Sequence, residues 1–193
     1  MKLSLALFLT AALSMAAGID TAKTIGNPSA PVTIELFSDF QCPACRQLHM
    51  QTLPLLMRDY IIPGKAYLVY KEFPLNQHAH GKEAATWAVA CARLGKYEQV
   101  ADVLFETQPT WENDGNIAKA LDKVLSPAEM KKAELLLKDP GVIAEVASDM
   151  QEGARESVNQ TPTMVLIHGT KRYPIGGVVS YNLLRSLLDD LAK

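Results

Sequence analysis

The feature that most constrains the fold is a long helical stretch, 78–158, which separates two parts of the chain with strand-forming patterns. It is rich in alanine, and prolines and glycines divide it into what we expect to be about four or five short helices. Before it, β-branched and apolar runs at 32–37 and 66–73 predict two strands, with a helix at 42–60 between them. These three elements form a β-α-β unit.

Strand-forming patterns return after the helical stretch. Residues 164–167 and 172–175 flank a turn at Gly169 and predict a hairpin. A last helix follows from about Ser180, which suits the N-cap position. This order predicts an α/β protein with a thioredoxin-like fold and an inserted all-helical domain.

The predicted domains follow from these boundaries. Residues 19–77 and 159–193 make the thioredoxin-like domain, and 78–158 make the helical insertion. Residues 20–31 are polar and carry prolines and a glycine, so we expect an arm before the first strand. Pro54 lies inside the predicted first helix and is expected to kink or split it.

The first 18 residues, 1–18, have the pattern of a secretory signal peptide. A short positive start, Met1-Lys2, precedes an apolar run at 3–13, and small residues follow it. An uncleaved anchor is the alternative, but this run is shorter than the roughly 20 residues that cross a bilayer. The pattern therefore predicts export to a periplasm or to the cell exterior, where disulfides persist.

Composition narrows the classes of function. Nineteen basic and 21 acidic residues give a formal charge of −2, and the sequence has no basic run, so nucleic acid is not an expected partner. Three cysteines in 193 residues are too few for a disulfide scaffold, and 48% hydrophobic residues suffice for a core. We therefore expect the cysteines to carry chemistry.

Cys42 and Cys45 stand at the start of the predicted first helix. The free amides and the positive dipole end of a helix stabilise a thiolate, and Pro43 suits the first helical position because its missing N–H would have had no partner. We expect the pKa of Cys42 to fall from roughly 8.5 into the range of about 3.5–7.5. Pro43 and Ala44 are the predicted redox-tuning pair, and because they add no further polar group, we expect a moderately oxidising disulfide.

A zinc site is the competing interpretation of two cysteines at this spacing. It needs further ligands, and the candidates are Cys91, His78 and His80. Cys91 lies in an alanine-rich helix, where a free cysteine usually packs as a small apolar side chain. Histidines in loops are usually solvated or capping. We therefore expect no metal or other cofactor.

Several short motifs are specific in combination. They are Gly26 to Ala30, Val32-Thr33-Ile34, Phe37-Ser38-Asp39-Phe40-Gln41-Cys42-Pro43-Ala44-Cys45, Phe73-Pro74-Leu75, His78-Ala79-His80 and Thr161-Pro162-Thr163. Together they resemble the DsbA-like family of exported thiol–disulfide oxidoreductases, over nearly all of the chain that follows the signal peptide. The resemblance implies a cis peptide at Thr161–Pro162, packed against the Cys42 sulfur, and a Thr161 backbone that pairs with an extended substrate segment.

One position departs from that family. Its members tend to carry an acidic residue six positions before the first cysteine, where a buried carboxylate can assist proton transfer at the second. Leu36 occupies this position, and alternation along a strand is expected to turn Glu35 to the opposite face. The group that takes the proton from Cys45 is left open.

The residues and the resemblance together predict a thiol–disulfide oxidoreductase, most simply a dithiol oxidase. Cys42 is expected to attack and to leave, and Cys45 to resolve. The expected substrates are unfolded or reduced proteins, and the resemblance implies a membrane quinone-linked oxidase as the partner for reoxidation. A disulfide isomerase or reductase that is kept reduced, and a non-enzymatic metal-binding protein of the same fold, are the alternatives.

Overall fold

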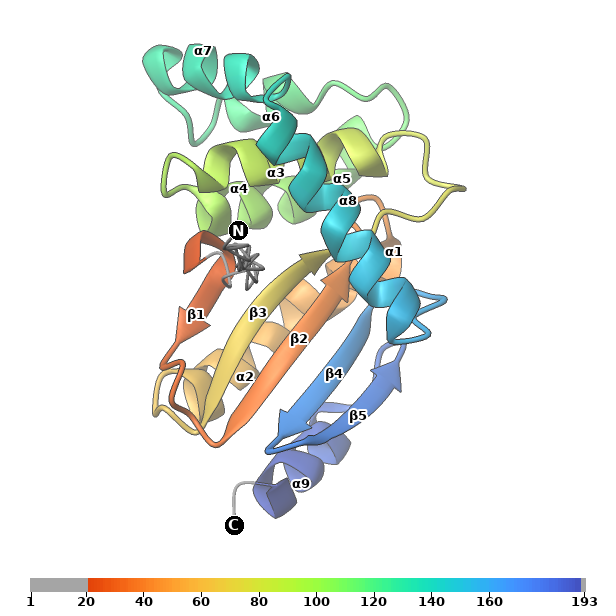
Figure 1. Ribbon diagram of the computed structural model, residues 1–193. Helices are drawn as coiled ribbons and strands as arrows, with labels where there is room; N and C mark the ends of the chain where they lie inside the picture. The colour runs from red at the N-terminus through yellow and green to blue at the C-terminus, as the bar shows by residue number, and fades with distance from the viewer. Residues whose placement is uncertain (1–20, 192–193) are drawn as a thin grey trace, which may run out of the picture.

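The computed structural model describes residues 21–191 and has a mixed five-stranded sheet with helices on both faces (Figure 1). The spatial order is β1-β3-β2-β4-β5. Strands β2 and β3 are parallel to each other, and every other neighbouring pair is antiparallel. The strands are β1 (Thr24–Gly26), β2 (Val32–Ser38), β3 (Ala66–Glu72), β4 (Thr163–His168) and β5 (Lys171–Gly176). The predicted signal peptide lies outside the described residues.

The connection between β2 and β3 is one long helical segment with irregular turns. It consists of α1 (Pro43–Gln47), the wider π-type turn η2 (Leu48–Thr52), α2 (Leu53–Leu56) and a second π-type turn η3 (Met57–Ile61). Pro54, in the first turn of α2, has no N–H to donate, and the wider turn before it accommodates its ring. Pro54 therefore does not split the helix.

The insertion between β3 and β4 contains six helices within the described residues, one more than the largest number expected. The last of them, α8, has 16 residues and runs from the insertion across one face of the sheet (Figure 1). The predicted thioredoxin-like fold with inserted helices is confirmed. The six are α3 (Gly81–Ala92), α4 (Tyr97–Glu106), α5 (Gln108–Trp111), α6 (Ile117–Leu121), α7 (Pro127–Leu136) and α8 (Pro140–Arg155).

Alternation along β2 divides the core between the two faces of the sheet. Leu36 belongs to the large core that includes the buried side of the β2–β3 helical segment and of the final helix, α9 (Tyr181–Leu191). Phe37 points to the other face, where it packs with Val165 beneath α8. The predicted N-cap of α9 is confirmed, because the Ser180 hydroxyl accepts a hydrogen bond from the amide of Leu183 at 3.3 Å.

The segment expected to be an arm is part of the fold instead. A short 3-10 helix, η1 (Thr21–Lys23), leads into β1, where Thr24 pairs with Val69 and Gly26 with Tyr67 on β3. Gly26 has a φ of +98°, a conformation that other residues rarely adopt, and it turns the chain away from the sheet edge. A strand of three residues has no detectable period, so its partner on β3 decides that it forms.

Within residues 21–191, no helix is both long and apolar enough to cross a membrane.

Candidate active site

The two cysteines lie where β2 turns into the first helix. Cys42 is the N-cap of α1, with φ −80° and ψ 121°, and Pro43 is the first helical residue. The turn before them is closed by the amide of Cys42, which donates to the Asp39 carbonyl at 3.0 Å. Both thiols are free, and Cys42 is 6% exposed whereas Cys45 is 1% exposed. Cys42 is therefore the sulfur nearer to an incoming substrate.

The Thr161–Pro162 peptide bond is cis, as the resemblance implied. The thiol of Cys42 donates to the carbonyl oxygen of Thr161 at 3.3 Å, so residues 119 positions apart in the chain meet at this sulfur. The Thr161 hydroxyl oxygen is buried and has no hydrogen-bond partner among the described residues, so its proton is available to a thiolate at Cys42. The structure thus brings all four predicted catalytic and substrate-binding residues together: Cys42, Cys45, Thr161 and Pro162.

The surroundings of Cys42 favour a thiolate. Its pKa is lowered to about 5, first because the thiol of Cys45 donates a hydrogen bond to the thiolate. Burial opposes this effect, while the hydroxyl of Thr161 and the amides of Cys45 and Ala44 add to it. The expected depression of the Cys42 pKa is confirmed, and hydrogen bonds at the helix start account for it.

The pKa of Cys45 is shifted in the opposite direction. Burial is the largest cause that raises its pKa well above the usual value, and the neighbouring Cys42 raises it further. The Ser38 hydroxyl and the Asp39 amide act in the other direction, and the amide lies 3.4 Å from the sulfur. At neutral pH the pair therefore consists of one thiolate and one thiol, with Cys45 holding the proton.

A buried carboxylate lies directly behind the cysteines. Asp39 is 1% exposed and accepts hydrogen bonds from the amide of Gln41 at 2.9 Å and the amide of Leu75 at 2.8 Å. Its Oδ2 also lies 2.6 Å from Nδ1 of His78. The sequence left the role of His78 open, and in the structure its ring is paired with this carboxylate. In the sequence, Asp39 lies three positions before Cys42 with no sign of this pairing.

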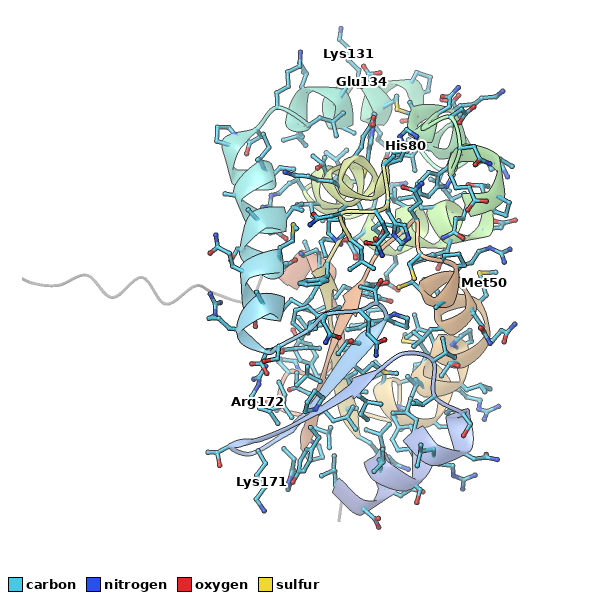
Figure 2. The ribbon with its side chains drawn as sticks, turned by 90° about the vertical axis from the view of Figure 1, so that its right-hand side faces the viewer. Met50, His80, Lys131, Glu134, Lys171 and Arg172 are labelled. Carbon is cyan, nitrogen blue, oxygen red and sulfur yellow. The ribbon has the colours of Figure 1, made fainter. Side chains whose placement is uncertain are left out.

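The helical insertion holds the cysteine loop through two glutamine side chains. The Gln108 amide group donates to the carbonyls of Phe40, at 2.6 Å, and Cys42, at 3.2 Å. Gln41 accepts a hydrogen bond from the backbone amide of His80 at 2.7 Å. Figure 2 shows His80 among the helices of the insertion. The insertion therefore fixes the backbone from which Cys42 projects.

Comparison with known proteins places this site in a family. The sequence profile of the thioredoxin family matches residues 19–190. The chain belongs to the thioredoxin family.

Individual relatives point to one branch of that family. A probable disulfide bond formation protein D of Bacillus cereus is 24% identical over 163 residues, which are 80% of this chain and 73% of the relative. Alpha-DsbA1 of Wolbachia pipientis superposes with a TM-score of 0.75 at 19% identity, over 88% of this chain and 90% of the other. A thioredoxin-like oxidoreductase from Silicibacter pomeroyi superposes with a TM-score of 0.68 at 25% identity, over 86% and 90%. The chain is a DsbA-like thiol–disulfide oxidoreductase, as its motifs indicated.

In this thioredoxin-family protein, the acidic residue of β2, Glu35, lies on the face of the sheet opposite to the cysteines. Glu35 points to the face that α8 covers and forms an ion pair with Arg172 at 2.5 Å. Its pKa is raised, chiefly by burial. The expectation that Glu35 faces away from the cysteines is confirmed, and Leu36 packs in the apolar core beside Cys45.

Among residues 21–191, no three His, Cys, Asp or Glu side chains gather in a way that would hold a metal ion. Cys91 is fully buried in α3, where burial raises its pKa to about 12, as expected of a core cysteine. Trp87 and Trp111 are also buried in the core.

Proposed function

We propose that this protein is an exported dithiol oxidase that introduces disulfides into reduced substrate proteins through Cys42 and Cys45. The observation that carries the proposal is the pKa of Cys42, lowered to about 5 beside a Cys45 that keeps its proton. A stabilised thiolate favours the reduced enzyme, which makes the Cys42–Cys45 disulfide a strong acceptor of electrons. Pro43 and Ala44 contribute no additional charge to this balance.

The proposed reaction has two exchanges. A substrate thiolate attacks Cys42, the bond between Cys42 and Cys45 breaks, and Cys45 leaves as a thiolate that takes up a proton. A second thiolate of the substrate then attacks the substrate sulfur that is bonded to Cys42, and Cys42 departs as the stable thiolate. The substrate has lost two electrons and two protons, and the enzyme is the dithiol.

Thr161 and Pro162 are the proposed docking site for the substrate. The Thr161 carbonyl lies beside the Cys42 sulfur, two residues before β4 begins, where an extended segment can pair with backbone groups. Reoxidation requires a second protein disulfide, and we propose a membrane quinone-linked oxidase as its source. The relatives named disulfide bond formation proteins support the proposed disulfide-forming role, and the signal-like pattern at 1–18 supports export.

The redox potential of the Cys42–Cys45 pair tests the direction of electron flow. Titration against glutathione buffers is expected to give a value less negative than about −200 mV. A value near the roughly −270 mV of thioredoxin would instead assign a reductase or an isomerase that is kept reduced. Stoichiometric copper or zinc bound through Cys42, without any thiol-oxidising activity, would assign the metal-binding alternative.

Two variants test the roles of the cysteines. Cys42→Ser is expected to abolish oxidation of a reduced model substrate, because no sulfur remains for the first attack. Cys45→Ala is expected to leave Cys42 in mixed disulfides that are visible on non-reducing gels. Activity retained by Cys42→Ser would contradict the assignment.

A further inference from the structure

Reoxidation of this enzyme requires a base for Cys45. After the Cys42 thiolate has attacked an oxidant, Cys45 must lose its proton before it can release the mixed disulfide, and its pKa is raised well above the usual value. Leu36 has no acidic group, and Glu35 is paired with Arg172 on the opposite face of the sheet. Neither residue can serve this step.

Asp39 is a buried acidic residue whose backbone contacts Cys45. Its backbone amide contacts the Cys45 sulfur at 3.4 Å, so covalent geometry keeps its carboxylate oxygens within about 8 Å of that sulfur. Two hydrogen bonds through one water molecule span about 6 Å, and a second water extends the reach past about 8 Å, so a short water chain can carry a proton across this range. A carboxylate has about four acceptor positions, and three are used by Gln41, Leu75 and His78, so Oδ1 retains one.

His78 connects this carboxylate to the surface. Asp39 is fully buried, whereas the His78 side chain is 19% exposed and its Nδ1 lies 2.6 Å from Asp39 Oδ2. An imidazole can accept a proton at one ring nitrogen and release one from the other. The pair therefore forms a short path from beside Cys45 to solvent.

We propose that Asp39 and His78 form a relay that takes the proton of Cys45 and delivers it to solvent while the enzyme is reoxidised. The inference rests on the proposed thiol–disulfide exchange at Cys42 and assigns its proton-transfer step. Asp39 is the acceptor, and His78 acts through Asp39 as a positioning and relay residue.

The step balances in atoms and electrons. Cys45 gives its proton to the Asp39–His78 pair, and its sulfur forms a bond to Cys42. The bond between Cys42 and the oxidant's sulfur breaks, and the oxidant leaves as a thiolate. The enzyme dithiol has lost two electrons to that disulfide, and the proton passes from His78 to water.

Other ionisable groups surround the pair. Cys42 and Cys45 lie on α1, and His80 and Glu83 lie at the start of α3. Glu72, at the end of β3, is held by the hydroxyl of Tyr97 at 2.6 Å. Of these ionisable side chains in the described part of the chain, the Cys45 sulfur is the one with a hydrogen bond to Asp39.

Reaction of the reduced enzyme with the aromatic disulfide 5,5′-dithiobis(2-nitrobenzoate) separates the two steps. Attack by Cys42 releases the first coloured thiolate at a rate proportional to reagent concentration. Attack by Cys45 releases the second at a rate independent of that concentration. In stopped-flow traces between pH 5 and 8, the second phase therefore reports the Cys45 step alone.

The test variant is His78→Asn, whose amide can keep the hydrogen bond to Asp39 but cannot relay a proton. We expect the second phase at pH 7 to slow at least about tenfold, and the first phase to change less than about twofold. His80→Asn is the matched control, since the His80 ring packs against Gly115 and not against Asp39, and it is expected to leave both phases unchanged.

The outcomes separate the relay from the function on which it rests. A wild-type enzyme without a first phase would overturn the proposed function. A normal first phase with a second phase that His78→Asn leaves unchanged would overturn the relay, and so would equal slowing of both phases. Should His78→Asn not fold, Asp39→Asn tests the same step, because its side chain keeps the shape of Asp39 but cannot take a proton. The second phase is then expected to slow at least about tenfold while the first changes less than about twofold, and an unchanged second phase contradicts the relay.

Discussion

At the scale of the residue, Cys42 and Cys45 carry the same thiol and differ in their surroundings. Cys42 receives hydrogen bonds from Cys45, Thr161 and the first helical amides, which stabilise its charge. Cys45 lies one turn deeper, where burial opposes ionisation. Three positions in sequence therefore separate the attacking sulfur from the one that keeps its proton.

Thr161 offers a test of this account at one hydroxyl group. Thr161→Val keeps the shape of the side chain but removes the donor that the Cys42 thiolate uses, so we expect the pKa of Cys42 to rise by about one unit from its value of about 5. Thiolate absorbance in the ultraviolet, followed across pH in the reduced protein, measures it. Thr161→Ser retains the hydroxyl and is the control; an unchanged pKa in Thr161→Val would contradict this role for the hydroxyl.

At the scale of the element, α8 depends on a close approach to the sheet. Gly153 faces the rings of Phe37 and Phe73, which meet edge to face with centroids 6.1 Å apart. A Cβ at position 153 would lie 2.5 Å from the Phe73 ring and 3.1 Å from Phe37. Glycine is needed here because of distance rather than backbone angle.

Gly153→Ala is accordingly expected to be destabilising, although alanine is the better helix former. The clash is expected to lower the free energy of unfolding by about 1–3 kcal/mol. Urea unfolding followed by circular dichroism measures the change. Ala154→Ser, at the exposed neighbouring position, is the control and is expected to cost less than about 0.7 kcal/mol. A Gly153→Ala protein as stable as the wild type would show that α8 can move away from the sheet.

At the scale of the whole molecule, a buried group of charges joins the N-terminal segment, the sheet and the insertion. Lys23 of η1 forms ion pairs with Glu145 at 2.8 Å and Asp149 at 2.5 Å on α8. Asp149 also accepts the amide of Glu72 on β3 at 3.1 Å. The Glu72 carboxyl is fully buried, and burial raises its pKa to about 8 although Lys23 and a hydrogen bond from Tyr97 oppose this.

This raised pKa predicts how stability depends on pH. Folded protein holds the Glu72 proton up to about pH 8, whereas the unfolded chain releases it near 4.5, so the folded state binds the extra proton between these values. Glu72 therefore makes stability fall as pH rises through that window, by at most about 1.4 kcal/mol per pH unit.

Glu72→Gln removes the titration while its carbonyl can still accept from Tyr97. We expect its free energy of unfolding to fall less between pH 5 and 8 than that of the wild type, as measured by urea unfolding at several pH values. Glu83→Gln, at an exposed position of α3, is the control and should keep the wild-type slope. Parallel slopes for Glu72→Gln and wild type would contradict a protonated Glu72.

Local sequence determined much of this protein. The hydrophobic period and the turn residues predicted β2, β3, the β4–β5 hairpin and α9, because each of these elements is long enough to show its pattern. The Cys42–Cys45 spacing, with Pro43 at the first helical position, indicated thiol chemistry because a helix start stabilises a thiolate whatever the rest of the fold.

Tertiary structure decided what depends on partners distant in the chain. Strand β1 forms because β3 offers it backbone hydrogen bonds, and a three-residue segment has no periodic pattern to reveal it. Asp39 and His78 are 39 positions apart, so no local pattern in the sequence could indicate that they pair. The spacing of Cys42 and Cys45 predicted their chemistry from the sequence alone. The contacts of the Asp39 carboxylate depend on residues distant in the chain, so only the folded structure shows them.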